Sequence, residues 1–145
     1  MANPILVPVD VEFEVSWREA LTTARGEATR RGAQLHVLGV VPDFGTSLVA
    51  SYFPEGYGEK MRTDAAAALQ KLAEEMLGDA VTWQVHVLQG DPVKSILAEA
   101  EKLDAELIVM AAHSPGERGF LTGTHADHVV AGAECSVYVV RRRGA

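Results

Sequence analysis

The sequence predicts an α/β protein, with one parallel five-stranded sheet covered by helices on both faces. Short apolar runs of strand length alternate along the chain with segments of helical periodicity. Residues 107–112 are uninterrupted apolar residues, which is typical of a strand buried on both faces of a sheet. The length of 145 residues suits one ordinary domain, and we assign residues 1–145 to it. Five strands joined through four helices by right-handed crossovers make a three-layer sandwich, a Rossmann-like arrangement.

The first third of the chain predicts a strand, a helix and a second strand. Residues 4–9 form a short apolar run that delivers Asp10 to its carboxyl end. Residues 16–19 have the pattern of a capping box, so a helix is expected to start at Ser16 and to end at Gly32. Residues 34–41 are mostly apolar and predict the second buried strand, which Pro42 ends.

The middle of the chain combines one long excursion with clear helix and strand signals. Residues 43–58 are rich in glycine, proline and aromatic residues, and we expect this excursion to cover a cleft or a neighbouring subunit. A helix is expected over residues 59–77. Residues 81–88 alternate between apolar and polar side chains, which predicts a strand near a sheet edge. Asp91 and Pro92 then mark the start of another helix.

The last third predicts strand, loop, helix and strand. A loop containing Gly116 and Gly119 follows the strand at residues 107–112, and Gly123-Thr124 precedes a helical pattern. The start of a helix offers unpaired backbone N–H groups and the positive end of its dipole, which together favour an anion. The expected ligand at this loop is therefore a phosphate. Residues 136–140 form the last strand.

Composition and charge exclude several classes of partner. The formal charge of −7 argues against nonspecific binding to nucleic acid or to an anionic membrane. The basic residues 141–143 are interpreted as a solvated end. No apolar run approaches the ~20 residues that a membrane helix needs, and the amino-terminal residues do not form a signal segment. The single cysteine, Cys135, cannot form an internal disulfide, so we expect a reduced, cytoplasmic setting and a small buried apolar residue rather than a redox sensor.

A metal site is not expected. His125 and His128 lie three positions apart on one predicted helix face, with Asp127 and His113 near them in sequence. This spacing is common by chance, and histidines on the exposed face of a helix usually have solvent partners. We interpret these residues as helix-surface side chains rather than as metal ligands.

The segment from residue 107 to residue 140 resembles the carboxyl-terminal half of universal stress protein domains. Their turn before the last strand has an A-P-C-P-V-like pattern, and residues 133–137 (AECSV) are similar to it. Their loop pattern is G-x2-G-x9-G-[S/T]. The two leading glycines fall on Ala111 and Ser114 here, and eight residues instead of nine separate Ser114 from Gly123. The resemblance covers the chain apart from residues 43–58, and it implies the strand order 3-2-1-4-5 of an adenine nucleotide alpha hydrolase-like fold.

The resemblance also implies a ligand site at the carboxyl ends of the first and fourth strands. In that site Asp10 accepts hydrogen bonds from the adenine amino group or a ribose hydroxyl, and Val40 and Val41 contact the base. The implied cofactor is ATP with Mg²⁺, and the whole set of expected binding residues is Asp10, Val40, Val41, Ala111, His113, Ser114, Gly116, Gly123 and Thr124. The family includes members that bind nucleotide and members that do not, so both readings remain open.

The function that follows from this resemblance is a dimeric stress-response sensor or interaction module with unknown protein partners. The family commonly dimerises by antiparallel pairing of its last strand, which here is residues 136–140. No catalytic residues are assigned, and the alternative function is a slow ATP hydrolase that uses the same cleft. The sequence lacks the GxxxxGK[ST] motif of P-loop enzymes and the lysine and aspartate positions of receiver domains.

Overall fold

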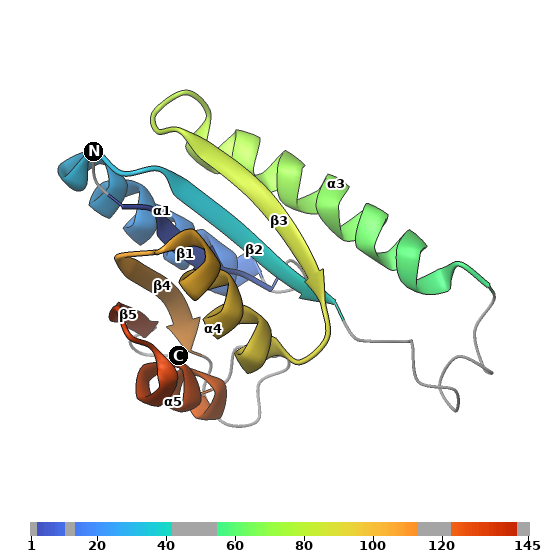
Figure 1. Cartoon of the computed structure of the whole chain (residues 1–145). Helices are drawn as coiled ribbons and strands as arrows, with labels where there is room; N and C mark the ends of the chain where they lie inside the picture. Colours follow the sequence, from blue (N-terminus) through green and yellow to red (C-terminus); the bar gives the residue numbers. More distant parts are fainter. Residues whose placement is uncertain (1–2, 11–13, 42–54, 113–122, 142–145) are drawn as a thin grey trace.

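The computed structural model describes residues 3–10, 14–41, 55–112 and 123–141. The strands are β1 (Ile5–Pro8), β2 (Leu35–Val41), β3 (Trp83–Gln89), β4 (Leu107–Ala112) and β5 (Ser136–Arg141). The helices are α1 (Glu14–Arg31), α3 (Tyr57–Leu77), α4 (Pro92–Leu103) and α5 (Gly123–Gly132). Strands and helices alternate along the chain, as the periodicity predicted (Figure 1).

All five strands are parallel and lie in the order β3-β2-β1-β4-β5, which confirms the expected topology. The first strand is the central one, and Ile5 pairs with Leu35 of β2 on one side and with Leu107 of β4 on the other. β3 and β5 are the edges of the sheet, so the predicted edge position of the strand at residues 81–88 is confirmed. Its residues are partly buried except for the exposed Gln84, so the burial does not alternate as the sequence pattern suggested.

Two apolar layers hold the sheet between the helices. Alternate residues of β1 point to opposite faces, so that Ile5 joins one layer and Leu6 the other. The first layer lies under α1 and α3, and it includes Leu21 and Leu69. The second lies under α4 and α5, and it includes Ile96. The sheet is consequently buried on both faces, which explains why β4 contains only apolar residues (Figure 1).

The helix boundaries agree with local signals at the ends of α1 and α3 and at the start of α4, and they depart from them at the starts of α1 and α3. The Asp91 side chain accepts a hydrogen bond from the backbone N–H of Lys94 at 2.9 Å, so the predicted cap of α4 is confirmed. The predicted start of α1 at Ser16 is wrong by a few residues, because the backbone is already helical at Glu14. α3 begins at Tyr57, so the end of the expected excursion is helical. Gly56 precedes it with a φ of 80°, a left-handed conformation that glycine adopts without strain.

The rest of the expected excursion, residues 43–54, lies outside the described residues. Among the helices that the structure describes, none is long and apolar enough to cross a membrane.

Candidate functional site

The sheet reverses its winding between β1 and β4, at the position where α/β sheets hold their ligands. The helix that follows β1 is α1, which covers one face of the sheet, and the helix that follows β4 is α5, which covers the other. The helices that follow β1 and β4 therefore lie on opposite faces of the sheet. In α/β sheets, the ligand cleft lies at the carboxyl-terminal edge where two such strands are neighbours.

Asp10 is placed at this edge by the backbone pairing of β1. The Val9 N–H donates to the Leu38 carbonyl at 2.9 Å and so extends the contact between β1 and β2 past the last residue of the strand. Asp10 follows directly, and only 8% of its surface is exposed. A carboxylate that is this buried costs free energy unless other groups compensate it, so its position in the fold is constrained.

Val40 and Val41 end the neighbouring strand at the same edge. Val41 is buried, with 8% exposed, and its carbonyl accepts a hydrogen bond of 3.0 Å from the Gly90 N–H. Gly90 has a φ of 135°, in the region that favours glycine, and it turns the chain from β3 into α4. The side chain of Val40 is half-buried against the apolar layer under α4 and α5.

The fourth strand brings Ala111 to the same edge, where it is buried and pairs with Val140 of β5. The helical backbone of α5 begins at Gly123, as predicted, and Thr124 is in its first turn. The structure thus brings four of the predicted binding residues to the ends of three adjacent strands, namely Asp10, Val40, Val41 and Ala111. His113, Ser114 and Gly116 lie outside the described residues, as does the side chain of Thr124.

The histidines of α5 do not form a metal site within the part of the chain that the structure describes. His125 is half-buried, whereas Asp127 and His128 are exposed. Among the described residues no group of three histidine, cysteine, aspartate or glutamate side chains is arranged to hold a metal ion. Cys135 is partly buried, and burial raises the pKa of its thiol. A raised pKa disfavours the reactive thiolate.

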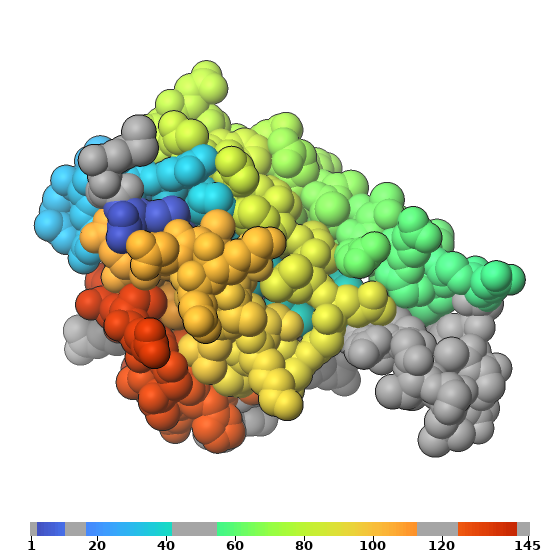
Figure 2. Space-filling model, viewed as in Figure 1, coloured from blue at the N-terminus to red at the C-terminus, as the bar shows by residue number. Residues whose placement is uncertain are grey.

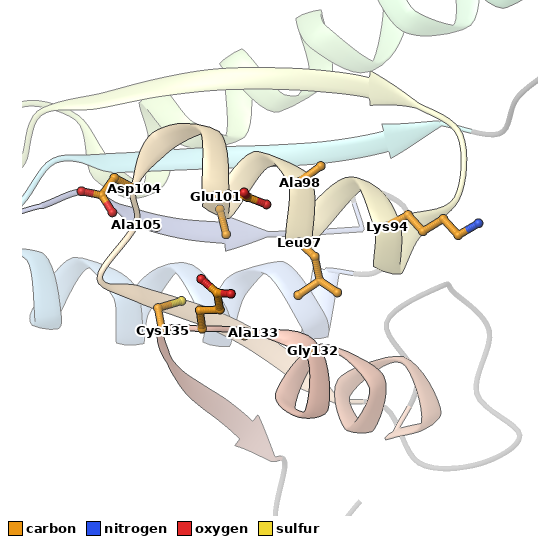
Figure 3. A pocket seen from close by; sticks show the side chains of 11 residues that line it. Lys94, Leu97, Ala98, Glu101, Asp104, Ala105, Gly132, Ala133 and Cys135 are labelled. Atoms are coloured by element: carbon orange, nitrogen blue, oxygen red, sulfur yellow. The ribbon is translucent and has the colours of Figure 1, made fainter.

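A cavity of about 500 Å³ lies along the groove between α4 and α5 (Figure 3). Leu97 of α4 and Gly132 of α5 meet in it, and Lys94, Glu101 and Glu134 add charges of both signs. The described residues that were predicted to bind nucleotide, Asp10, Val40, Val41 and Ala111, do not line this groove.

One buried polar cluster was missed by the sequence analysis. His36 of β2, His86 of β3 and Glu99 of α4 meet between the sheet and α4. His36 and Glu99 are almost fully buried. The signal in the sequence was a histidine at an inward position of an otherwise apolar strand, but the meeting of the three residues depends on strand register and helix placement.

Comparison with known proteins agrees with this fold. The model of the universal stress protein family matches residues 1–141. Universal stress protein G of Salmonella typhimurium is 30% identical over 145 residues, which cover 97% of this chain and 100% of that protein. Among solved structures, a universal stress protein from Lactobacillus plantarum superposes with a TM-score of 0.72 at 26% identity, and the match covers 96% of this chain and 97% of that one.

A universal stress protein from Archaeoglobus fulgidus, solved in complex with dAMP, shares the fold with a TM-score of 0.60 at 21% identity. That match covers 94% of this chain and 96% of the other. The agreement of strand order, family match and full-length relatives leads to one conclusion: the chain belongs to the universal stress protein family.

Proposed function

We propose that this protein binds an adenine nucleotide, ATP with Mg²⁺, at the carboxyl ends of β1 and β4. In this proposal it acts as a dimeric sensor or interaction module in the response to stress. The observation that carries the nucleotide proposal is the buried carboxylate of Asp10, which stands where the winding of the sheet reverses. The dAMP complex of a relative with the same fold supports it, because that ligand is also an adenine nucleotide.

The proposed roles divide between the base and the phosphates. Asp10 accepts a hydrogen bond from the adenine amino group or from a ribose hydroxyl, because an ionised carboxylate is an acceptor only. Val40 and Val41 provide apolar surface and main-chain groups for the base at the adjacent strand end.

The phosphates are assigned to the loop that leads from β4 into α5. Gly123 and Thr124 start α5, and backbone N–H groups at a helix start attract anions. In this proposal Ser114 and Gly116 supply loop contacts, and Ala111 and His113 complete the set of binding residues. Ala111 and Ser114 occupy positions where the family pattern has glycine, so we expect weaker binding than in members with the full motif.

Dimerisation is proposed through β5. Within the described residues β5 pairs with β4 and forms an edge of the sheet. Its sequence is mostly apolar, and Tyr138 is 45% exposed. An apolar edge strand presents backbone groups for pairing with another chain, and a second copy in antiparallel orientation satisfies them.

Isothermal titration calorimetry with ATP and Mg²⁺ on the natively purified protein tests the nucleotide proposal. We expect saturable heat and an increase in the melting temperature. The Gly123→Val variant places a branched side chain where a phosphate approaches, so it should lose the heat while keeping its circular dichroism spectrum. If wild-type protein gives neither heat nor thermal stabilisation at millimolar ATP, the nucleotide proposal fails.

ATP turnover in the same samples separates a binding module from a slow hydrolase. We expect bound ATP to be recovered intact from wild-type protein. Steady release of phosphate that Gly123→Val abolishes would favour the hydrolase instead.

A further inference from the structure

His36 and Glu99, which are buried, form a cluster with the partly buried His86, and the proposed function does not use it. His36 is the second residue of β2, and its position in the register is opposite Gln84 of β3. His86 lies two residues further along β3, on the same face of the sheet. α4 covers this face of the sheet, and its residue Glu99 completes the cluster from the helix side. Figure 2 shows α4 and α5 side by side on this face of the molecule.

The two imidazole rings are joined nitrogen to nitrogen. Nδ1 of His36 lies 2.7 Å from Nε2 of His86, and the ring planes differ by 16°. The ring centroids are 4.9 Å apart, which fits two nearly coplanar rings that meet edge to edge rather than face to face. At this distance one nitrogen must carry a hydrogen and the other must accept it.

Glu99 favours one of the two tautomers when both rings are neutral. Its Oε1 lies 3.8 Å from Nδ1 of His86, and a carboxylate favours the tautomer that carries a hydrogen on that nitrogen. Nε2 of a neutral His86 is then the acceptor, and Nδ1 of His36 donates to it.

One added proton fits this arrangement. If His86 becomes an imidazolium, its Nδ1–H faces the Glu99 carboxylate and its Nε2–H donates to Nδ1 of His36. A second added proton does not fit, because two N–H groups would then face each other across 2.7 Å. Two charged rings side by side would also repel each other, and the 26% exposure of the His86 side chain screens this repulsion only in part.

Among the residues that the structure describes around the rings, Glu99 supplies a compensating charge. On the α4 side the rings face Glu99. Lys102, one turn further along α4, is exposed. From β1 the register places the apolar Leu6 beside His36. Burial is the largest cause that lowers the pKa of His36, His86 lowers it further, and Glu99 acts in the opposite direction.

We propose that the His36–His86–Glu99 cluster is an acid-sensitive latch, which holds α4 on β2 and β3 while the pair carries at most one added proton and opens when both rings become protonated. The direction follows from proton linkage. An opened α4 leaves both imidazole rings in water, where each can take a proton, whereas the geometry of the closed pair has room for one added proton at most. The closed form is therefore stable above about pH 6.5 and loses stability as the pH falls below that value.

Hydrogen exchange of the α4 amides, followed by mass spectrometry, measures the opening directly. After correction for the intrinsic exchange rate, we expect the population of opened α4 to rise by roughly tenfold per pH unit below about pH 6, because the opened form binds one proton more. The His36→Leu variant keeps a single ring beside Glu99, and that ring can be protonated in the closed form as well. The population of opened α4 should therefore lose about one tenfold step per pH unit and change little with pH.

His128→Gln is the matched control, because His128 is an exposed histidine of α5 outside the cluster. It should keep the wild-type dependence on pH. An identical dependence in wild type and His36→Leu would overturn the proposal.

A titration of wild-type protein by nuclear magnetic resonance keeps the proposal testable if His36→Leu does not fold. We expect the two rings to share one titration, and the second protonation to coincide with loss of protection in α4. Two independent titrations near the ordinary histidine pKa, with α4 protected throughout, would exclude the latch.

Discussion

Gly39 of β2 lies so close to Leu69 of α3 that the missing side chain is part of the packing. A Cβ atom on residue 39 would lie 2.6 Å from Cδ1 of Leu69, which is fully buried. The Cδ1 methyl group of Leu69 therefore fills the space that a side chain on residue 39 would occupy. The same strand carries Val40 and Val41 to the candidate site, so this contact also supports the edge of the sheet where the site lies.

Replacing Gly39 with alanine should destabilise the fold. Leu69 has to shift within a packed layer, and overpacking of this kind lowers the free energy of unfolding by about 1–3 kcal/mol. Gly26→Ala is the matched control, since Gly26 is exposed in the middle of α1 and nothing lies within 4 Å of a Cβ there. That control should gain about 0.5–1 kcal/mol from helix propensity. Urea denaturation of both variants checks the difference, and equal changes would contradict the close contact.

Replacing Asp10 with alanine should weaken nucleotide binding without unfolding the protein. Loss of a hydrogen bond to a charged acceptor costs on the order of 1.5–3 kcal/mol, which is roughly ten- to hundredfold in Kd. Calorimetry with ATP and Mg²⁺ measures the loss. Asp64→Ala removes the same charge from an exposed position on α3 and should bind as wild type does. Equal affinities for the two variants would remove Asp10 from the site.

A charge at Tyr138 should weaken the proposed dimer. Two copies paired through β5 would bring two added carboxylates close together, and Tyr138→Glu should therefore raise the dissociation constant of the dimer. Analytical ultracentrifugation at several concentrations measures it. Gln84→Glu adds the same group to an exposed position on β3, the opposite edge of the sheet, and should leave the dimer intact. A wild-type protein that is monomeric at micromolar concentration would exclude dimerisation through β5.

Cys135 should react slowly with iodoacetamide in the folded protein. Burial raises the pKa of its thiol, so less thiolate is present near neutral pH, and the thiolate is the nucleophile. Alkylation followed by mass spectrometry should show a faster rate in urea, where the thiol returns to its ordinary pKa. A folded protein that reacts as fast as the unfolded chain would instead favour a reactive, redox-sensing cysteine.

The sequence predicted what depends on local pattern and missed what depends on register. The apolar run of β4 and the Asp91-Pro92 cap of α4 are local signals, and the structure confirms both. The strand order came from the family resemblance, because periodicity carries no information about which strands are neighbours. His36 and His86 lie on different strands, so their contact was not visible until the register of β2 and β3 was known.

The candidate site divides in the same way. Asp10 was expected at the carboxyl end of the first strand, and the structure places it there in a buried position. The start of α3 was misjudged because Tyr57 and Gly58 have the composition of a loop, whereas the left-handed Gly56 before them marks the actual beginning of the helix. The phosphate contacts remain a prediction, since Ser114 and Gly116 lie outside the described residues.

The central place of β1 has a consequence for synthesis on the ribosome. The nascent chain makes β1 first, and β2 can pair with one side of it soon afterwards. The other side pairs with Leu107 and Ile108 of β4, which emerge only after α4. Until β4 is made, β1 is an apolar edge strand whose unpaired side can pair with other chains. Translation that stops before β4 should therefore release fragments that aggregate, even though they contain three of the five strands.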